Sequence, residues 1–129
     1  MKLITFVIFL TISGVANSAN TSPSIDNHAQ LIGTWVLDMT PNNPNDNNFA
    51  KMTIDKIEKG KVYGEFYRDG VKMQYGVINK VTKRITVALV SSDNSGKYNS
   101  SFYLENGMLY GTTHAIERGF LAIWTATKQ

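Results

Sequence analysis

Residues 97–115 read KYNSSFYLENGMLYGTTHA, and this stretch decides the fold. Its centre, Asn106-Gly107, separates two runs in which apolar and polar residues alternate, Lys97 to Glu105 and Met108 to Ala115. An Asn-Gly pair favours a two-residue type I′ turn, because both turn positions need φ above zero. Alternation with a period of two is typical of strands that bury one face. The stretch therefore predicts an antiparallel β-hairpin.

The same pattern extends in both directions from this hairpin, with short turns such as Lys59-Gly60 and Asp69-Gly70 between the runs. The further strands are predicted at Leu31 to Asp38, Ala50 to Ile57, Lys61 to Arg68, a run that aligns Met73, Tyr75 and Val77, Arg84 to Ser91, and Phe120 to Thr127. Short connections pair each strand with its neighbour in sequence, and a long meander removes its exposed edges by closing. The predicted fold class is all-β, an antiparallel up-and-down meander of about eight strands that closes into a small barrel.

The chain divides into three predicted segments: a signal peptide at 1–19, a flexible leader at 20–30 and the barrel domain at 31–129. Lys2 precedes an apolar run over residues 3–12, and small residues follow it, which is the pattern of a cleaved secretory signal. The sequence contains no cysteine, so disulfides and a lipoprotein anchor are excluded. We expect an exported, disulfide-free protein that is periplasmic or secreted.

Two short motifs point to a family of barrels. Leu31-Ile32-Gly33-Thr34-Trp35 resembles the Gly-x-Trp opening of the calycins, the superfamily that contains lipocalins and avidins, and residues 124–128, WTATK, resemble a late stretch of avidin-like chains. The resemblance implies a calycin-like barrel that binds a ligand inside or at its loops. It also implies that Gly33 lets the first strand bend and that Trp35 plugs one end. The residues by which avidins contact biotin find no match, and biotin is not inferred.

The alternation in each strand predicts which side chains point into the barrel. Those that could hold a ligand combine aromatic surface with hydrogen-bonding groups: Trp35, Tyr75, Tyr98, Ser100, Thr113 and Trp124. One hypothesis is a non-enzymatic barrel that binds a small, partly apolar ligand through these residues. In the other, the interior is filled and the tyrosine hydroxyls bond to the backbone. The protein would then be a protein-binding module, an exported inhibitor or secreted effector, that uses the 39–49 loop and the hairpin tips.

That loop is the one long connection, and it contains two prolines and five asparagines (MTPNNPNDNNF). Long loops in compact domains are uncommon without a function. The sequence leaves open whether this loop is a lid over one mouth of the barrel or an excursion from it.

The remaining patterns exclude most chemistry and most partners. His28 and His114 lack the spacing of metal ligands, and no serine lies in a nucleophile-elbow pattern, so we predict no metal, no cofactor and no enzymatic activity. The formal charge of +3, or +2 without Lys2, is too small to predict binding to nucleic acid or membrane. A dimer or tetramer is expected from apolar side chains predicted to face outward: Tyr63, Tyr67, Ile78, Val90, Leu121 and Ile123.

Overall fold

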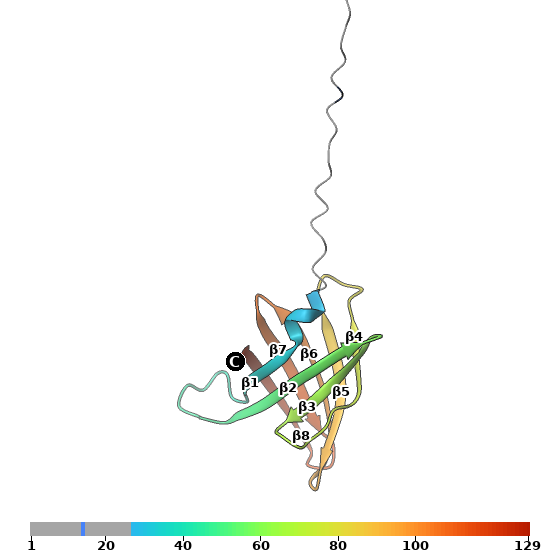
Figure 1. Cartoon of the computed structure of the whole chain (residues 1–129). Helices are drawn as coiled ribbons and strands as arrows, with labels where there is room; N and C mark the ends of the chain where they lie inside the picture. The colour runs from blue at the N-terminus through green and yellow to red at the C-terminus, as the bar shows by residue number, and fades with distance from the viewer. Residues whose placement is uncertain (1–13, 15–26) are drawn as a thin grey trace, which may run out of the picture.

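The computed structural model describes Gly14 and residues 27–129, and residues 27–129 form a closed barrel of eight strands preceded by a short 3₁₀ helix (Figure 1). The elements are η1 (Asn27–Leu31), β1 (Gly33–Asp38), β2 (Phe49–Glu58), β3 (Lys61–Tyr67), β4 (Gln74–Asn79), β5 (Thr86–Asp93), β6 (Gly96–Glu105), β7 (Met108–Ala115) and β8 (Phe120–Lys128). The predicted fold class is confirmed. Apart from Gly14, the predicted signal peptide lies outside the described residues, as does 20–26 of the predicted leader. No helix in the described part of the chain is long and apolar enough to cross a membrane.

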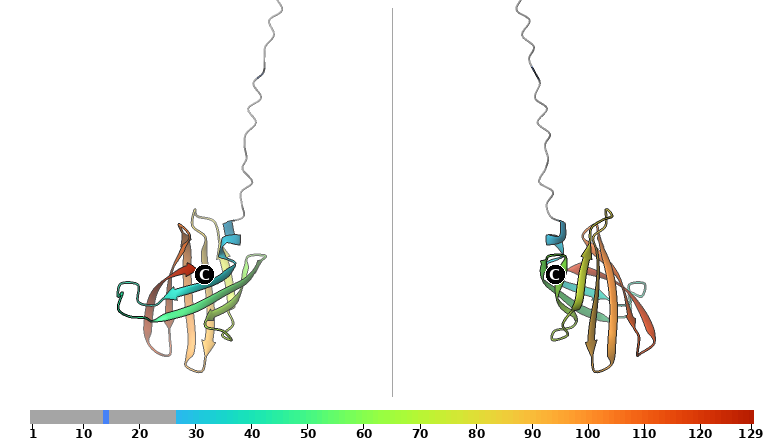
Figure 2. Two further views of the ribbon diagram at one scale, coloured as in Figure 1. Left: turned by 60° about the vertical axis from the view of Figure 1, so that its left-hand side comes forward. Right: turned by 90° about the vertical axis from the view of Figure 1, so that its right-hand side faces the viewer.

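The barrel closes because the first and last strands pair with each other. Every neighbouring pair is antiparallel in chain order, and β1 joins β8 through the register Leu37↔Ala126. Closure leaves no sheet edge exposed along the barrel wall. Figure 2 shows the two sides of the resulting barrel, in which alternate loops gather at opposite ends.

The N-terminal segment closes one end of this barrel. The sequence predicts that the first strand begins at Leu31, but Leu31 ends η1, and the strand begins at Gly33. The buried indole Nε1 of Trp35 donates a hydrogen bond of 2.9 Å to the Leu31 carbonyl oxygen, and Leu31 is itself fully buried. Lys128 Nζ donates to the Gln30 carbonyl oxygen at 2.9 Å and lies 5.6 Å from the centre of the Trp35 ring. The helix, the first strand and the last strand are therefore held together at this end, which we call the closed end.

A single glycine makes room for the second tryptophan. Gly111 on β7 lies opposite Trp124 on β8, and a Cβ atom at position 111 would lie 2.3 Å from Trp124 Cζ2. The Trp124 indole is fully buried and packs on Phe66 and Phe102, with ring centres 5.8 and 5.7 Å away. This aromatic layer fills the middle of the barrel.

Strand β4 departs from the predicted alternation. The sequence predicts that Tyr75 and Val77 point inward, but Tyr75 is 83% exposed and Val77 is 50% exposed, so this prediction is wrong for both. Tyr75 has φ of 54°, and the register with β5 shifts between Gln74 and Val77. A bulge inserts an extra residue and moves the following side chains to the opposite face. Ile78, predicted to face outward, consequently packs against the core.

Most of the other apolar residues that were predicted to face outward do lie on the outer wall. Tyr63, Leu121 and Ile123 are exposed, as predicted, whereas Val90 is half-buried. Tyr67 does not face outward, because its side chain lines the cavity described below.

Gly111→Ala is expected to destabilise the protein by about 1–3 kcal/mol, because the added methyl group overlaps the buried Trp124 ring and the core has no space to yield. Urea unfolding followed by tryptophan fluorescence measures the free energy of unfolding. Ser101→Ala, on the exposed face of β6, is the control and should change that free energy by less than about 0.5 kcal/mol. Equal stability of Gly111→Ala and the wild type would contradict this account of the core.

Candidate functional site

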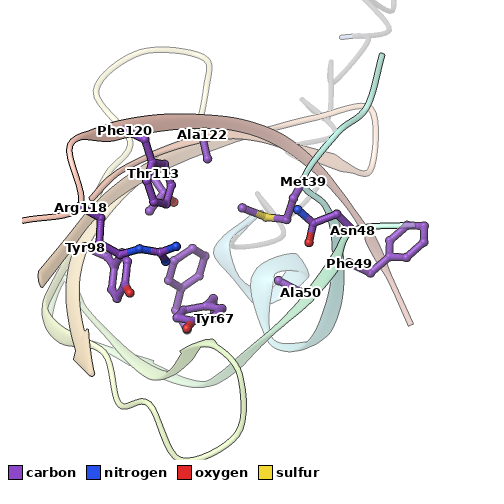
Figure 3. A pocket seen from close by; sticks show the side chains of 11 residues that line it. Met39, Asn48, Phe49, Ala50, Tyr67, Tyr98, Thr113, Arg118, Phe120 and Ala122 are labelled. Carbon is purple, nitrogen blue, oxygen red and sulfur yellow. The ribbon is translucent and has the colours of Figure 1, made fainter. Parts of the chain in front are cut away.

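The end opposite η1 contains a cavity of about 310 Å³. Its walls come from the ends of β1, β2, β3, β6, β7 and β8 and from the β7–β8 turn (Figure 3). The lining residues are Met39, Asn48, Phe49, Ala50, Phe66, Tyr67, Tyr98, Thr113, Arg118, Phe120 and Ala122. Ligand pockets in proteins are mostly apolar, with a few polar groups that fix orientation, and their volumes begin near this size. We call this space the mouth cavity.

Below the mouth cavity, a chain of hydrogen bonds ties its floor to the aromatic layer. Trp124 Nε1 donates to Thr113 Oγ1 at 2.9 Å, and the Ser100 and Thr113 hydroxyls are 2.8 Å apart. Ser100 and Thr113 are a cross-strand pair on β6 and β7, which explains their approach. All three side chains are buried, so their polar groups need these partners. The hydroxyls are thus occupied in holding the floor.

Two tyrosines form one wall of the mouth cavity, and an aspartate outside the lining holds both of them. Tyr67 at the end of β3 and Tyr98 on β6 lie 5.4 Å apart between ring centres, with the edge of one ring facing the other ring. Tyr67 donates its hydroxyl hydrogen to Asp93 Oδ2 at 2.8 Å, and Tyr98 donates to Asp93 Oδ1 at 3.1 Å. The Ser95 backbone N–H also donates to Asp93 Oδ1, at 2.8 Å. One carboxylate therefore fixes the orientation of both rings.

The charge of Asp93 depends on these donors. Burial acts to raise the Asp93 pKa, but hydrogen bonds from Tyr67, the Ser95 N–H and Tyr98, with the positive charge of Arg68, outweigh it and lower the pKa below its ordinary value. Arg68 Nη2 lies 3.8 Å from Asp93 Oδ2. In return, the hydrogen bond to Asp93, together with burial, raises the Tyr67 pKa. At neutral pH Asp93 is a carboxylate and Tyr67 is a neutral phenol.

The β7–β8 turn brings a cation to the rim of the mouth cavity. The Glu117 carboxylate accepts a hydrogen bond of 2.8 Å from the backbone N–H of Lys97, which ties this turn to the start of β6. That bond, with one from the Glu117 N–H, lowers the Glu117 pKa. The Arg118 guanidinium lies 4.8 Å from the centre of the Phe120 ring. Figure 3 shows the Arg118 side chain reaching inward over the cavity, toward Tyr67.

The long β1–β2 loop borders the same cavity only at its ends. Met39 and Asn48 are joined by a backbone hydrogen bond of 2.9 Å from the Met39 N–H to the Asn48 carbonyl oxygen, and both line the cavity. Between them, the loop projects to the side of the barrel (Figures 1 and 2). The sequence leaves open whether this loop is a lid over the mouth or an excursion from the barrel, and the structure shows the excursion.

The six residues that the sequence proposes for the site separate in space. Tyr98 and Thr113 line the mouth cavity. Ser100 and Trp124 lie beneath it and bond to Thr113, whereas Trp35 lies under η1 at the closed end. Tyr75 projects from the outer wall because of the bulge in β4.

Sequence reasoning missed Tyr67, Asp93 and Arg118. Strict alternation after Phe66 places Tyr67 outside, but the strand ends at Tyr67 and its ring turns in toward Asp93. Asp93 and Arg118 lie at turns, where alternation carries no information. The one indication in the sequence was the type of residue at two turns. Asp93 begins a tight turn that leads into β6, and Arg118 lies in a turn beside Phe120.

Gly33 has φ of 132°, and Trp35 is buried beneath η1 at the closed end of an eight-stranded meander. These are the bend and the plug that the Gly-x-Trp resemblance implies. The fold is a closed, eight-stranded antiparallel β-barrel. No protein-family model matches the chain, and no curated protein sequence matches it. Among solved structures, a mutant of the fluorescent protein UnaG aligns at 15% identity with a TM-score of 0.40, over 78% of this chain and 97% of that chain. At that score, the match carries no argument about the function of this barrel.

Metal-binding clusters are absent from the described residues, where no three His, Asp or Glu side chains gather. His114 is exposed on the outer wall, beside Asn99 and Thr112, and faces away from the mouth cavity. It therefore contributes nothing to the chemistry of the cavity.

Tyr67→Phe should cost about 1.5 kcal/mol of unfolding free energy at pH 7, because it removes a hydrogen bond to the charged Asp93. The folded Asp93 pKa is lowered, so its stabilisation is complete above the ordinary aspartate pKa of about 3.9 and is lost as the pH falls through the folded value. The difference between wild type and variant should shrink over that acidic range in urea unfolding. Tyr110→Phe, on the outer wall, is the control. A Tyr67→Phe effect independent of pH would contradict the Asp93 assignment.

Proposed function

We propose that the protein is an exported, non-enzymatic binding protein that takes a small, partly apolar ligand into its mouth cavity. The observation that carries this proposal is the cavity itself, which lies at one end of a barrel that is packed elsewhere. The aromatic layer of Phe66, Phe102 and Trp124 forms a dry base beneath it. A preformed hollow with an apolar lining is favourable for apolar ligands, because binding releases water from both surfaces.

The polar groups of the lining favour binding over catalysis. The hydroxyls of Tyr67, Tyr98 and Thr113 are each engaged in a hydrogen bond to another side chain. A general acid or base must be within reach of a substrate proton and have a pKa near the working pH. Asp93 is held as a carboxylate behind the two tyrosine rings, and its pKa is shifted away from neutrality. These groups are suited to holding the walls in place.

A cavity-filling substitution tests ligand binding directly. Ala122→Phe is expected to weaken the binding of N-phenyl-1-naphthylamine, an uncharged aromatic dye, by about tenfold or more, because the new ring occupies the cavity. The dye is titrated and its fluorescence increase gives Kd.

Ala88→Phe provides the matched control, since Ala88 is exposed on the outer face of β5. Its dye affinity should stay within about twofold of the wild type. If the wild type fails to bind the dye, or if Ala122→Phe binds it as well as the wild type does, ligand binding in the mouth cavity is wrong.

Export is tested separately. The protein recovered from outside the cytoplasm of its host should have an intact mass that lacks the predicted signal peptide of residues 1–19. A full-length chain confined to the cytosolic fraction would contradict export.

A further inference from the structure

We propose that the ligand of the mouth cavity is an aromatic organic anion whose charged group is bound by Arg118, an inference that rests on the proposed binding function. Arg118 lines the cavity from the β7–β8 turn. A guanidinium presents five N–H donors in a planar fork that matches carboxylate, sulfonate or phosphate oxygens. Its position at the rim lets the charged group of a ligand remain close to water while the rest enters the barrel.

The charge of Arg118 has no carboxylate counter-ion in the described part of the chain. Within residues 27–129 Arg118 forms no ion pair, and its described partner is the face of Phe120 at 4.8 Å. The other arginines near aromatic rings differ in this respect, because Arg68 is near Asp93 and Arg84 pairs with Glu105 at 3.1 Å. Arg118 is thus a cation at a cavity rim with its hydrogen-bond donors available.

Two acidic groups at this end of the barrel, Asp93 and Glu117, have partners other than Arg118. Asp93 accepts hydrogen bonds from two tyrosines and a backbone N–H, and Arg68 lies 3.8 Å away. Glu117, the neighbour of Arg118 in sequence, directs its carboxylate to the Lys97 backbone N–H instead. Neither carboxylate pairs with Arg118, and Arg118 is the charged side chain in the lining of the mouth cavity.

The lining indicates what the rest of the anion is. Five aromatic residues are among those that line the cavity: Phe49, Phe66, Tyr67, Tyr98 and Phe120. Flat aromatic surfaces offer offset-stacked and edge-to-face contacts to an aromatic ligand. Asn48 adds an amide at the rim. The combination of aromatic walls with one uncompensated cation fits a small aromatic ligand that carries one acidic group.

A matched pair of dyes isolates the role of the charge. N-phenyl-1-naphthylamine and 8-anilinonaphthalene-1-sulfonate share one aromatic skeleton and differ by the sulfonate. Arg118→Gln is expected to weaken binding of the sulfonate dye by about tenfold, from loss of charge-assisted hydrogen bonds. Binding of the neutral dye should change by less than about twofold, because its skeleton contacts the same walls.

Two further variants keep the result interpretable. Arg118→Lys retains the positive charge and should recover most of the affinity for the sulfonate dye, which separates charge from any change in folding. Arg84→Gln is the matched control: Arg84 also lies over an aromatic ring, 4.5 Å from the Tyr103 centre, but at the closed end. It should leave the affinities for both dyes unchanged.

The outcomes distinguish this proposal from the proposed function. If both dyes bind and Arg118→Gln weakens neither, or weakens both equally, the anion proposal is overturned while ligand binding stands. If neither dye binds to the wild type, both proposals are overturned. A selective loss of the sulfonate dye in Arg118→Gln, with recovery in Arg118→Lys, supports the proposal.

Discussion

The hydrogen bond between the Trp35 indole and the Leu31 carbonyl is the contact on which the organisation of this barrel depends. It fixes the helix η1 across one end, where a tryptophan fills space that an eight-stranded barrel otherwise leaves open. The contact works because the strand bends at Gly33, and because Lys128 of the last strand reaches the carbonyl of Gln30. The contacts that plug this end thus involve both strands that close the sheet. The mouth cavity lies at the opposite end of the barrel.

The interior has a gradient of packing from the plug to the mouth. Leu31 and Trp35 fill the closed end, and the Trp124 layer fills the middle, where Gly111 admits the indole. Toward the mouth the side chains become polar and bond to one another, as Ser100, Thr113 and the Tyr67–Asp93–Tyr98 group show. Such networks hold side chains in fixed positions when each member has a partner. The walls of the mouth cavity are therefore already held in place, which would reduce the entropy lost on binding of the proposed ligand.

The strands could be predicted from the sequence because burial on one face imposes a period of two. That rule placed β7 at Met108–Ala115 and put Tyr98, Thr113 and Trp124 inside, where all three are buried. It failed at Tyr75, where a bulge resets the alternation, and at Tyr67, where the strand ends.

The candidate site was less predictable than the strands. Thr113 and Tyr98 follow from alternation, whereas Arg118 and Asp93 depend on how turns from different hairpins meet in space. No local sequence pattern indicates which turns lie close together in the folded barrel. The η1 helix was missed for a related reason, since a single turn of 3₁₀ helix is too short to show a period.

The central claim is that ligands enter the end opposite the Trp35 plug. The most direct measurement is a ¹H–¹⁵N NMR titration of the isotopically labelled protein with N-phenyl-1-naphthylamine. Binding in the mouth cavity should shift the backbone amides of Tyr67, Tyr98, Thr113 and Ala122, which line it, and leave the Trp35 indole and Leu31 unmoved. Shifts confined to the outer wall around Ala88 and Thr112, or centred on the Trp35 indole, would contradict it.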